Sequence, residues 1–336
     1  MNKKLTFQPK LLRNVFIFLV LIVEIIVFSL LTDRFLTITN ITNVLRQISF
    51  VGIVSFGMTM LIISGGLDLS VGSVLALAGC ISAYVIYFGY PTWIAVVVGV
   101  LSGLIAGFIN GSLVVYAKIS TVIVTLGMMY MARGIVYVIT GGGPIFLDMF
   151  PGFGFIGRGY LGPIPVPVVF AVTILAIFWF IMSKTAFGKY IYAVGGNIEA
   201  TRLSGINVNN VRLYSYSITG ALSGFTGVLM ISRLASGQPS MGTGFEFDVI
   251  VAVVLGGTSL AGGEGSVIGS TVGALIVGII NNGLNLLGVS AWYQSVFKGG
   301  ILIIAVLMDN ILKQKGMGLF SIKGLFKKKI SINTDK

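Results

Sequence analysis

The stretch that decides the fold class runs from FVGIVSFGMTMLII (50–63) through SGGLDLSVGS (64–73) to VLALAGCISAYVIYF (74–88). Its two outer parts are long and apolar, and the part between them carries a single carboxylate, Asp68. A transmembrane helix needs about 20 predominantly apolar residues. The stretch therefore predicts two membrane spans joined by a short turn.

Length and composition extend this pattern to the whole chain. Of its 336 residues, 56% are hydrophobic and only 10% are charged. That is too little charge to cover a soluble protein of this size, so we expect an all-α fold: a polytopic membrane helical bundle of about ten transmembrane helices. The predicted spans are 15–32, 44–64, 71–89, 93–116, 120–140, 166–183, 212–232, 246–261, 266–287 and 292–309.

The basic residues orient the predicted bundle. With the N-terminus inside, sixteen of the 22 lysines and arginines fall in inside segments, four in outside segments and two in spans. Lysine and arginine are enriched in cytoplasmic loops. This predicts a multi-pass protein of the bacterial inner (plasma) membrane with both termini cytoplasmic. The net charge of +12 then reflects orientation and contact with membrane lipid, and no nucleic-acid partner is expected.

The predicted organisation has three parts. Residues 1–14 form a cytoplasmic tail, 15–309 a transmembrane domain that starts with an uncleaved helix, and 310–336 a basic cytoplasmic tail. Glycines recur every four residues at 99, 103, 107 and 111, and again at 265, 269 and 273. Such spacing lets helices approach closely in lipid, either within one bundle or at a dimer seam or moving gate.

A carboxylate at Asp68 is costly inside a membrane unless its surroundings stabilise it. Asp68 or Ser70 can cap the helix predicted to start near Val71, and Gly65 and Gly66 allow a sharp turn before it. One interpretation is therefore a tight cytoplasmic-side turn with a capped helix start. The alternative is a direct role in gating or in contact with a partner.

The longest predicted inside loop, 184–212, contains NIEATRLSG (197–205), which has the marks of a short helix. Asn197 can serve as the N-cap, Glu199 stands in the first turn, and Gly205 can end the helix. Such a helix has little apolar surface of its own. We expect it to lie against another protein surface.

Several other polar residues fall within or near spans. Glu24 and Lys298 are interpreted as single intramembrane charges. Four asparagines form hydrogen bonds between helices or line a path for a hydroxylated solute: Asn110, Asn281, Asn282 and Asn285. Histidine is absent, Cys80 is the one cysteine, and no phosphate-binding G-x-x-x-x-G-K-[ST] motif occurs, so we expect no catalytic residues and no metal site.

Three long motifs carry a resemblance to a known family. GGLDLSVGSVLALAG (65–79), GKYIYAVGGNIEATRLSGINVNNVRL (188–213) and GGTSLAGGEGSVIGSTVGALIVGIINNGLNLLGVSAWYQ (256–294) resemble permease subunits of sugar ABC importers of the ribose-permease type. This is the family of inner membrane components of binding-protein-dependent transport systems. The resemblance runs from about residue 35 to 309, with the motifs in the same order.

The resemblance implies a bundle of about ten spans, two permease copies around one alternating-access pathway, two cytoplasmic ATP-binding subunits and an external sugar-binding protein. ATP and magnesium are then expected on the partner ATPase, with no cofactor on this chain. Permeases of this kind carry a coupling helix with an E-A-A-x-x-x-G signature, which this chain matches in part because Thr201 stands for the second alanine. The implied coupling residues are Asn197, Glu199, Ala200, Thr201, Arg202 and Gly205.

For the external binding protein, the candidate docking residues are the four outside cations, Arg34, Arg46, Arg158 and Arg233. Three alternatives to a sugar importer remain at this point. One is an ABC permease for branched-chain amino acids or nucleosides. A second is an ion-coupled secondary carrier, which has few coupling charges here, and the third, a membrane enzyme, lacks a catalytic set.

Overall fold

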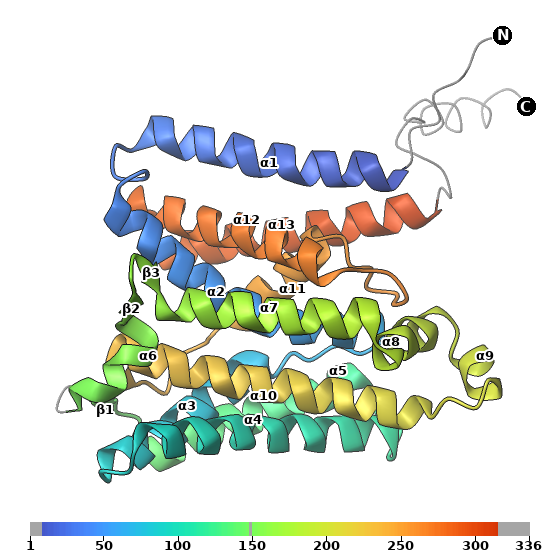
Figure 1. Cartoon of the computed structure of the whole chain (residues 1–336), viewed down its shortest axis with the longest axis horizontal. Helices are drawn as coiled ribbons and strands as arrows, with labels where there is room; N and C mark the ends of the chain where they lie inside the picture. The colour runs from blue at the N-terminus through green and yellow to red at the C-terminus, as the bar shows by residue number, and fades with distance from the viewer. Residues whose placement is uncertain (1–8, 148–149, 315–336) are drawn as a thin grey trace, which may run out of the picture.

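The computed structural model describes residues 9–147 and 150–314. Its long helices lie side by side along one axis (Figure 1). They are α1 (Pro9–Leu31), α2 (Ile38–Ile63), α3 (Val71–Tyr87), α4 (Thr92–Val115), α5 (Thr121–Thr140), α7 (Val166–Lys184), α10 (Val208–Leu234), α11 (Phe245–Leu255), α12 (Val267–Leu286) and α13 (Ala291–Gln314). These helices match the predicted spans in order, and six of them are long and apolar enough to cross a membrane: α2, α4, α5, α7, α10 and α12. The prediction of an all-α, polytopic membrane bundle is confirmed.

Short elements occupy the two ends of the bundle. One end holds η1 (Pro151–Gly154), α6 (Phe155–Arg158) and two small antiparallel pairs. In these, β1 (Ile145–Phe146) pairs with β4 (Ser236–Gly237), and β2 (Tyr160–Leu161) pairs with β3 (Ile164–Pro165). The other end holds α8 (Ala186–Gly196) and α9 (Ile198–Leu203). Figure 1 shows that α1 starts and α13 finishes at this second end, as an even number of crossings requires.

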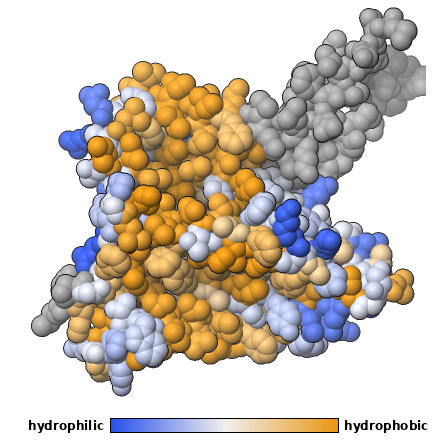
Figure 2. Space-filling model, in the orientation of Figure 1, coloured by the Kyte–Doolittle hydropathy of each residue, from blue (hydrophilic) through white to orange (hydrophobic). Residues whose placement is uncertain are grey.

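The outer surface shows where a membrane would surround the molecule. Figure 2 shows a broad band of hydrophobic side chains across the middle of the long helices, with hydrophilic side chains gathered toward both ends. An exposed apolar area of this extent is typical of a lipid-facing surface.

The core forms around α2, in which every residue from Ile48 to Ile63 is buried. On its far side α10 crosses α4 at close range. A Cβ at Gly103 of α4 would collide with the carbonyl of Gly220 in α10, and a Cβ at Gly224 would collide with the carbonyl of Gly99. The glycine period of α4 therefore packs helices within one bundle.

Several predicted boundaries were wrong. Helix α2 begins six residues early, at Ile38, because the Thr37 side chain caps it by accepting from the N–H of Asn40. Helix α11 has only 11 residues, about 17 Å at 1.5 Å per residue, so it covers about half of a 30 Å hydrocarbon core. Helices α1 and α13 also run into the predicted tails; the rest of those tails, 1–8 and 315–336, lies outside the described residues.

Candidate functional site

The segment predicted as an inside loop, 184–212, is mostly helical. Helix α8 begins at Ala186 and is capped by Thr185, whose hydroxyl accepts a hydrogen bond from the N–H of Gly188 at 3.2 Å. The hydroxyl of Tyr192 donates to the carbonyl of Gly265 at 2.9 Å, and burial raises the pKa of Tyr192. Helix α8 is thereby tied to the segment that leads into α12. The loop prediction missed this helix, although Thr185 followed by an apolar run was a usable capping signal.

The predicted short helix is confirmed as α9. Oδ1 of Asn197 accepts from the N–H of Ala200 at 2.9 Å, and Glu199 pairs with Arg202 at 3.0 Å. The hydroxyl of Thr201 is buried and donates to the carbonyl of Asn197 at 2.7 Å. Gly205 has a φ of +80°, a left-handed conformation that favours glycine after a helix end. Caps at both ends thus hold six residues in a defined helix.

Helix α9 lies at the tip of the molecule beyond the long helices (Figure 1). Leu203 on it is 88% exposed, and Ile198 is exposed as well. Beside it, a hollow of about 380 Å³ lies between α8 and the start of α10 and is lined by aromatic and polar residues that include Tyr190, Asn207 and Tyr214. The α8–α9 end therefore offers both an apolar protrusion and a recess to a partner.

The segment between α2 and α3 is largely buried, with Gly65 as its one exposed residue. Asp68 is 1% exposed, and its Oδ1 accepts from both the N–H and the hydroxyl of Ser70, at 2.7 Å and 2.5 Å. No side-chain cap bond is found at the start of α3, so the prediction that Asp68 or Ser70 caps this helix is wrong; Asp68 instead holds Ser70, the residue before α3, in place. Gly65 has a φ of +81°, and a Cβ at Gly66 would lie 2.5 Å from Cδ1 of Leu61. The predicted tight turn is therefore present and most of its residues are packed against the bundle, while its location on the cytoplasmic side stays a prediction.

Three helices anchor this segment. Nδ2 of Asn110 in α4 donates to Oδ2 of Asp68 at 3.3 Å and to the hydroxyl of Ser70 at 3.0 Å. The hydroxyl of Thr121, the first residue of α5, donates to the carbonyl of Leu67 at 2.9 Å and also contacts the hydroxyl of Tyr216 in α10. Two of the predicted gating residues, Asp68 and Ser70, thus share one polar network with the predicted path residue Asn110.

The other predicted path residues do not join it. Asn282 in α12 and Asn40 in α2 exchange two side-chain hydrogen bonds, at 2.9 Å and 2.8 Å. Asn285 is exposed and accepts from Nε2 of Gln294 at 2.8 Å, while Asn281 is half-buried. Asn282 therefore holds two helices together, and a role for Asn281 and Asn285 in lining a path stays a prediction.

The four arginines predicted to lie outside differ in accessibility. Arg34 and Arg158 are exposed, and Arg233 is half-buried with its guanidinium 5.6 Å from the ring centre of Phe50. Arg46 is only 9% exposed: its guanidinium lies 4.6 Å from the ring centre of Tyr160, and its Nη2 donates to the carbonyl of Arg158 at 3.0 Å.

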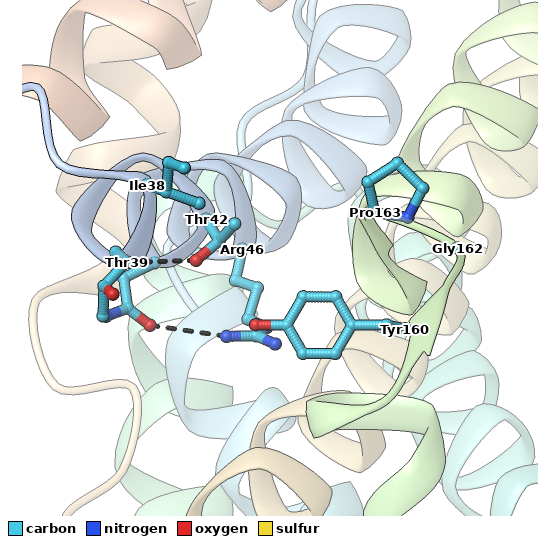
Figure 3. A pocket seen from close by; sticks show the side chains of 8 residues that line it. Ile38, Thr39, Thr42, Arg46, Tyr160, Gly162 and Pro163 are labelled. Atoms are coloured by element: carbon cyan, nitrogen blue, oxygen red, sulfur yellow. Dashed lines mark hydrogen bonds between the residues drawn. The ribbon is translucent and has the colours of Figure 1, made fainter.

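Figure 3 shows Arg46 and Tyr160 against each other in a recess of about 370 Å³ between the start of α2 and the β2–β3 hairpin. Arg46 is the third residue of the predicted span 44–64 and was assigned to its outer end. Helix α2 in fact begins at Ile38, so Arg46 lies about two turns inside it. Of the four candidate docking residues, Arg34 and Arg158 are therefore exposed, Arg233 is partly accessible and Arg46 is buried; a role in docking stays a prediction.

Sequence reasoning missed the charges of α11. Lys298 was interpreted as a single charge, yet its Nζ donates to Oδ2 of Asp248 at 2.9 Å. Glu246 and Asp248 both stand in the first turn of α11, where backbone N–H groups favour negative charge. Two acidic residues directly before the apolar run VIVAVVL were the available signal.

The sequence was also compared with those of known proteins. Residues 40–306 match the family model described as "Branched-chain amino acid transport system / permease component". The chain is 44% identical over 301 residues to the ribose import permease protein of Haemophilus influenzae, covering 89% of this chain and 93% of that protein. It is 46% identical over 294 residues to the ribose import permease protein of Bacillus subtilis, covering 87% and 91%.

More distant similarity extends to permeases named for other sugars. The chain is 38% identical over 298 residues to the D-allose transport system permease protein of Escherichia coli, with 88% of this chain and 91% of that protein covered. No solved structure matches the chain.

Proposed function

Because the chain belongs to the family of branched-chain amino acid transport system / permease components, we propose that it is the membrane-spanning permease subunit of an ATP-driven, binding-protein-dependent importer of a simple sugar, with ribose as the first candidate. The main support for this function is the 44–46% identity, over about nine tenths of the chain, to proteins named as ribose import permeases. Translocation by alternating access needs no bond chemistry on this chain. ATP and magnesium would bind a separate cytoplasmic subunit.

The α8–α9 end is proposed to receive that ATPase. A coupling element must transfer displacement, and α9 is suited to this because Asn197 and Gly205 define its two ends. Helix α8 connects it to α7, α2 and the segment before α12, so movement of α9 reaches several long helices. Leu203, 88% exposed, would enter an apolar groove on the ATPase.

The opposite end is proposed to receive an extracytoplasmic sugar-binding protein. Arg34 and Arg158 are its accessible cations and would pair with acidic side chains on that protein. Helices α8 and α9 lie at the other end (Figure 1), so the two partners would approach from opposite sides of the membrane. We infer a homodimer, in which a second copy of this chain completes the pathway.

The test of this function is uptake in cells that lack their own ribose importer. Expressed with its ATPase and binding protein, the chain should support accumulation of labelled ribose that unlabelled monosaccharides, but not leucine, reduce. Leucine accumulation without ribose accumulation would contradict the assignment of a sugar. It would support the second candidate solute, a branched-chain amino acid, which is the solute named in the family description.

Orientation is proposed from the basic residues and has its own test. Cysteines introduced at Ser204 and Gly152, after replacement of buried Cys80, probe opposite ends of the bundle. In intact cells an impermeant thiol reagent should label the cysteine at 152 and not the one at 204. The reverse pattern would invert the proposed orientation.

A further inference from the structure

The chain from Gln238 to Gly244 is irregular in conformation and joins β4 to the half-length helix α11. Two contacts show how far this segment lies from the ends of the neighbouring helices α5 and α3. Nη1 of Arg133 in α5, about 10 Å along the helix from Thr140, donates to the carbonyls of Pro239 and Met241 at 2.6 Å and 2.7 Å. The carbonyl of Gly242 packs against Gly72, which lies about 22 Å along α3 from Tyr87.

The segment 238–244 therefore lies at the depth of the long helices, between the two ends of the bundle. Part of it is nevertheless exposed on the surface of the molecule. Gln238, Ser240 and Thr243 are exposed, as is Phe247 at the start of α11. Lipid cannot satisfy the polar groups of irregular backbone; such backbone at membrane depth is found only where protein covers it or where it lines a water-filled cavity. On α5, which carries Arg133, Gly127 and Gly134 are exposed, and a Cβ at either would meet nothing within 4 Å.

Two charged side chains lie beside this segment: Arg133, which contacts Pro239 and Met241, and Glu246, in the first turn of α11. Glu246 is 7% exposed, and its Oε2 lies 2.5 Å from the place of a Cβ on Gly72. Across residues 9–147 and 150–314, neither Glu246 nor Arg133 forms an ion pair within 4.0 Å. Arg133 uses only Nη1 in the hydrogen bonds found for it, so Nε and Nη2 remain as donors.

We propose that Glu246 and Arg133, with the hydroxyls of Ser240 and Thr243 and the amide of Gln238, form a solute-contact site for a neutral polyhydroxylated molecule inside the translocation pathway. The proposal rests on the proposed function, because it assigns a site to the same pathway. A carboxylate accepts and a guanidinium donates, so the two charges together fit neighbouring hydroxyls of a monosaccharide. The site lies where α3 and α11 begin, so relative movement of these helices would change its access.

Water access is the first test and does not depend on transport. In a Cys80→Ala background, Ser240→Cys and Thr243→Cys should react with a small water-soluble thiol reagent in the membrane. Val172→Cys, 58% exposed on α7, is the matched lipid-facing control and should not react. If both pathway cysteines react no faster than the control, the proposal is overturned.

Solute contact is the second test. In proteoliposomes with the ATPase and binding protein, Glu246→Gln and Arg133→Lys should each lower kcat/KM for ribose uptake about tenfold or more. They should also change the ratio of ribose to 2-deoxyribose uptake, which a purely structural defect would not do. Thr173→Ala on the lipid-facing side of α7 is the control.

Unchanged kinetics and unchanged sugar ratio in both variants would overturn the site while leaving the permease function intact. Absence of ribose uptake by the wild-type complex would instead contradict the proposed function. The same variants are checked for correct folding by their elution as single species and by their thermal unfolding midpoints.

Discussion

Nζ of Lys298 in α13 lies 2.9 Å from Oδ2 of Asp248 in α11. The side chains are 29% and 11% exposed, and this ion pair ties the last helix of the bundle to the half-length helix. The other ion pair of the described residues, Glu199–Arg202, is 73% and 60% exposed and joins residues of one short helix. The two pairs differ in burial, so they should differ in their contribution to stability.

Lys298→Met should lower the stability of the protein by about 2 kcal/mol, because it leaves the Asp248 carboxylate without its cation. Adding Asp248→Asn should restore part of the loss. The measurement is the midpoint of thermal unfolding in detergent. Arg202→Gln, which breaks the exposed pair, is the control and should leave the midpoint unchanged; equal shifts in Lys298→Met and the control would contradict the assignment.

Asp68→Asn should be tolerated better than Asp68→Leu. An amide still accepts from Ser70, and the Oδ1 of Asn110, which has no partner among the described residues, can turn to accept from the new amide nitrogen. Leucine removes every acceptor and leaves the Ser70 N–H buried and unpaired, a cost of about 1–3 kcal/mol. The fraction of each variant that elutes as a single species after solubilisation measures this difference. Equal losses for both substitutions would show that the carboxylate charge itself is required.

Gly205→Val should weaken coupling without affecting membrane insertion. A β-branched residue at a φ of +80° costs about 1–2 kcal/mol, so the end of α9 would shift or fray. Gly205→Asn is the matched control, because asparagine adopts this conformation more readily. We expect reduced co-purification of the ATPase and reduced sugar-stimulated ATP hydrolysis for valine only. Normal values for the valine variant would remove α9 from the coupling path.

Arg34→Glu and Arg158→Glu together should weaken association of the sugar-binding protein by up to about fivefold per residue, because exposed ion pairs contribute about 0–1 kcal/mol each. The effect should be larger at low salt, where charges are least screened. Binding is measured to the complex in nanodiscs at two salt concentrations. Arg202→Glu, at the opposite end, should have no effect. An unchanged Kd for the double variant at both salt concentrations would exclude these arginines from docking.

The sequence predicted those features that depend on local composition. Apolar length identified the long helices in order, and the polar cap signals at Asn197 and Gly205 identified α9, because an N-cap and a left-handed terminal residue act within a few positions of the chain. The regular glycines of α4 correctly indicated close helix packing. These signals need no knowledge of distant residues.

The features that the sequence analysis missed depend on contacts between residues far apart in the chain. The burial of Asp68 depends on Asn110, 42 residues away, and the pairing of Lys298 depends on Asp248, 50 residues away. Arg46 looked like a surface cation until β2 placed Tyr160 over it. Helix α11 was predicted too long because the span was extended through GGTSLA (256–261), although the apolar run ends at Leu255 and the chain turns at Gly256, where a Cβ would meet the backbone of Gly269.

The most direct measurement of the central claim is ribose uptake into proteoliposomes that contain the permease, its ATPase and the sugar-binding protein. Import by a permease of an ATP-driven system should require ATP on the ATPase side and the binding protein on the other, and it should persist when ionophores abolish all ion gradients. Uptake that needs neither ATP nor the binding protein, and that ends when the ion gradients are removed, would identify an ion-coupled carrier and contradict the assignment.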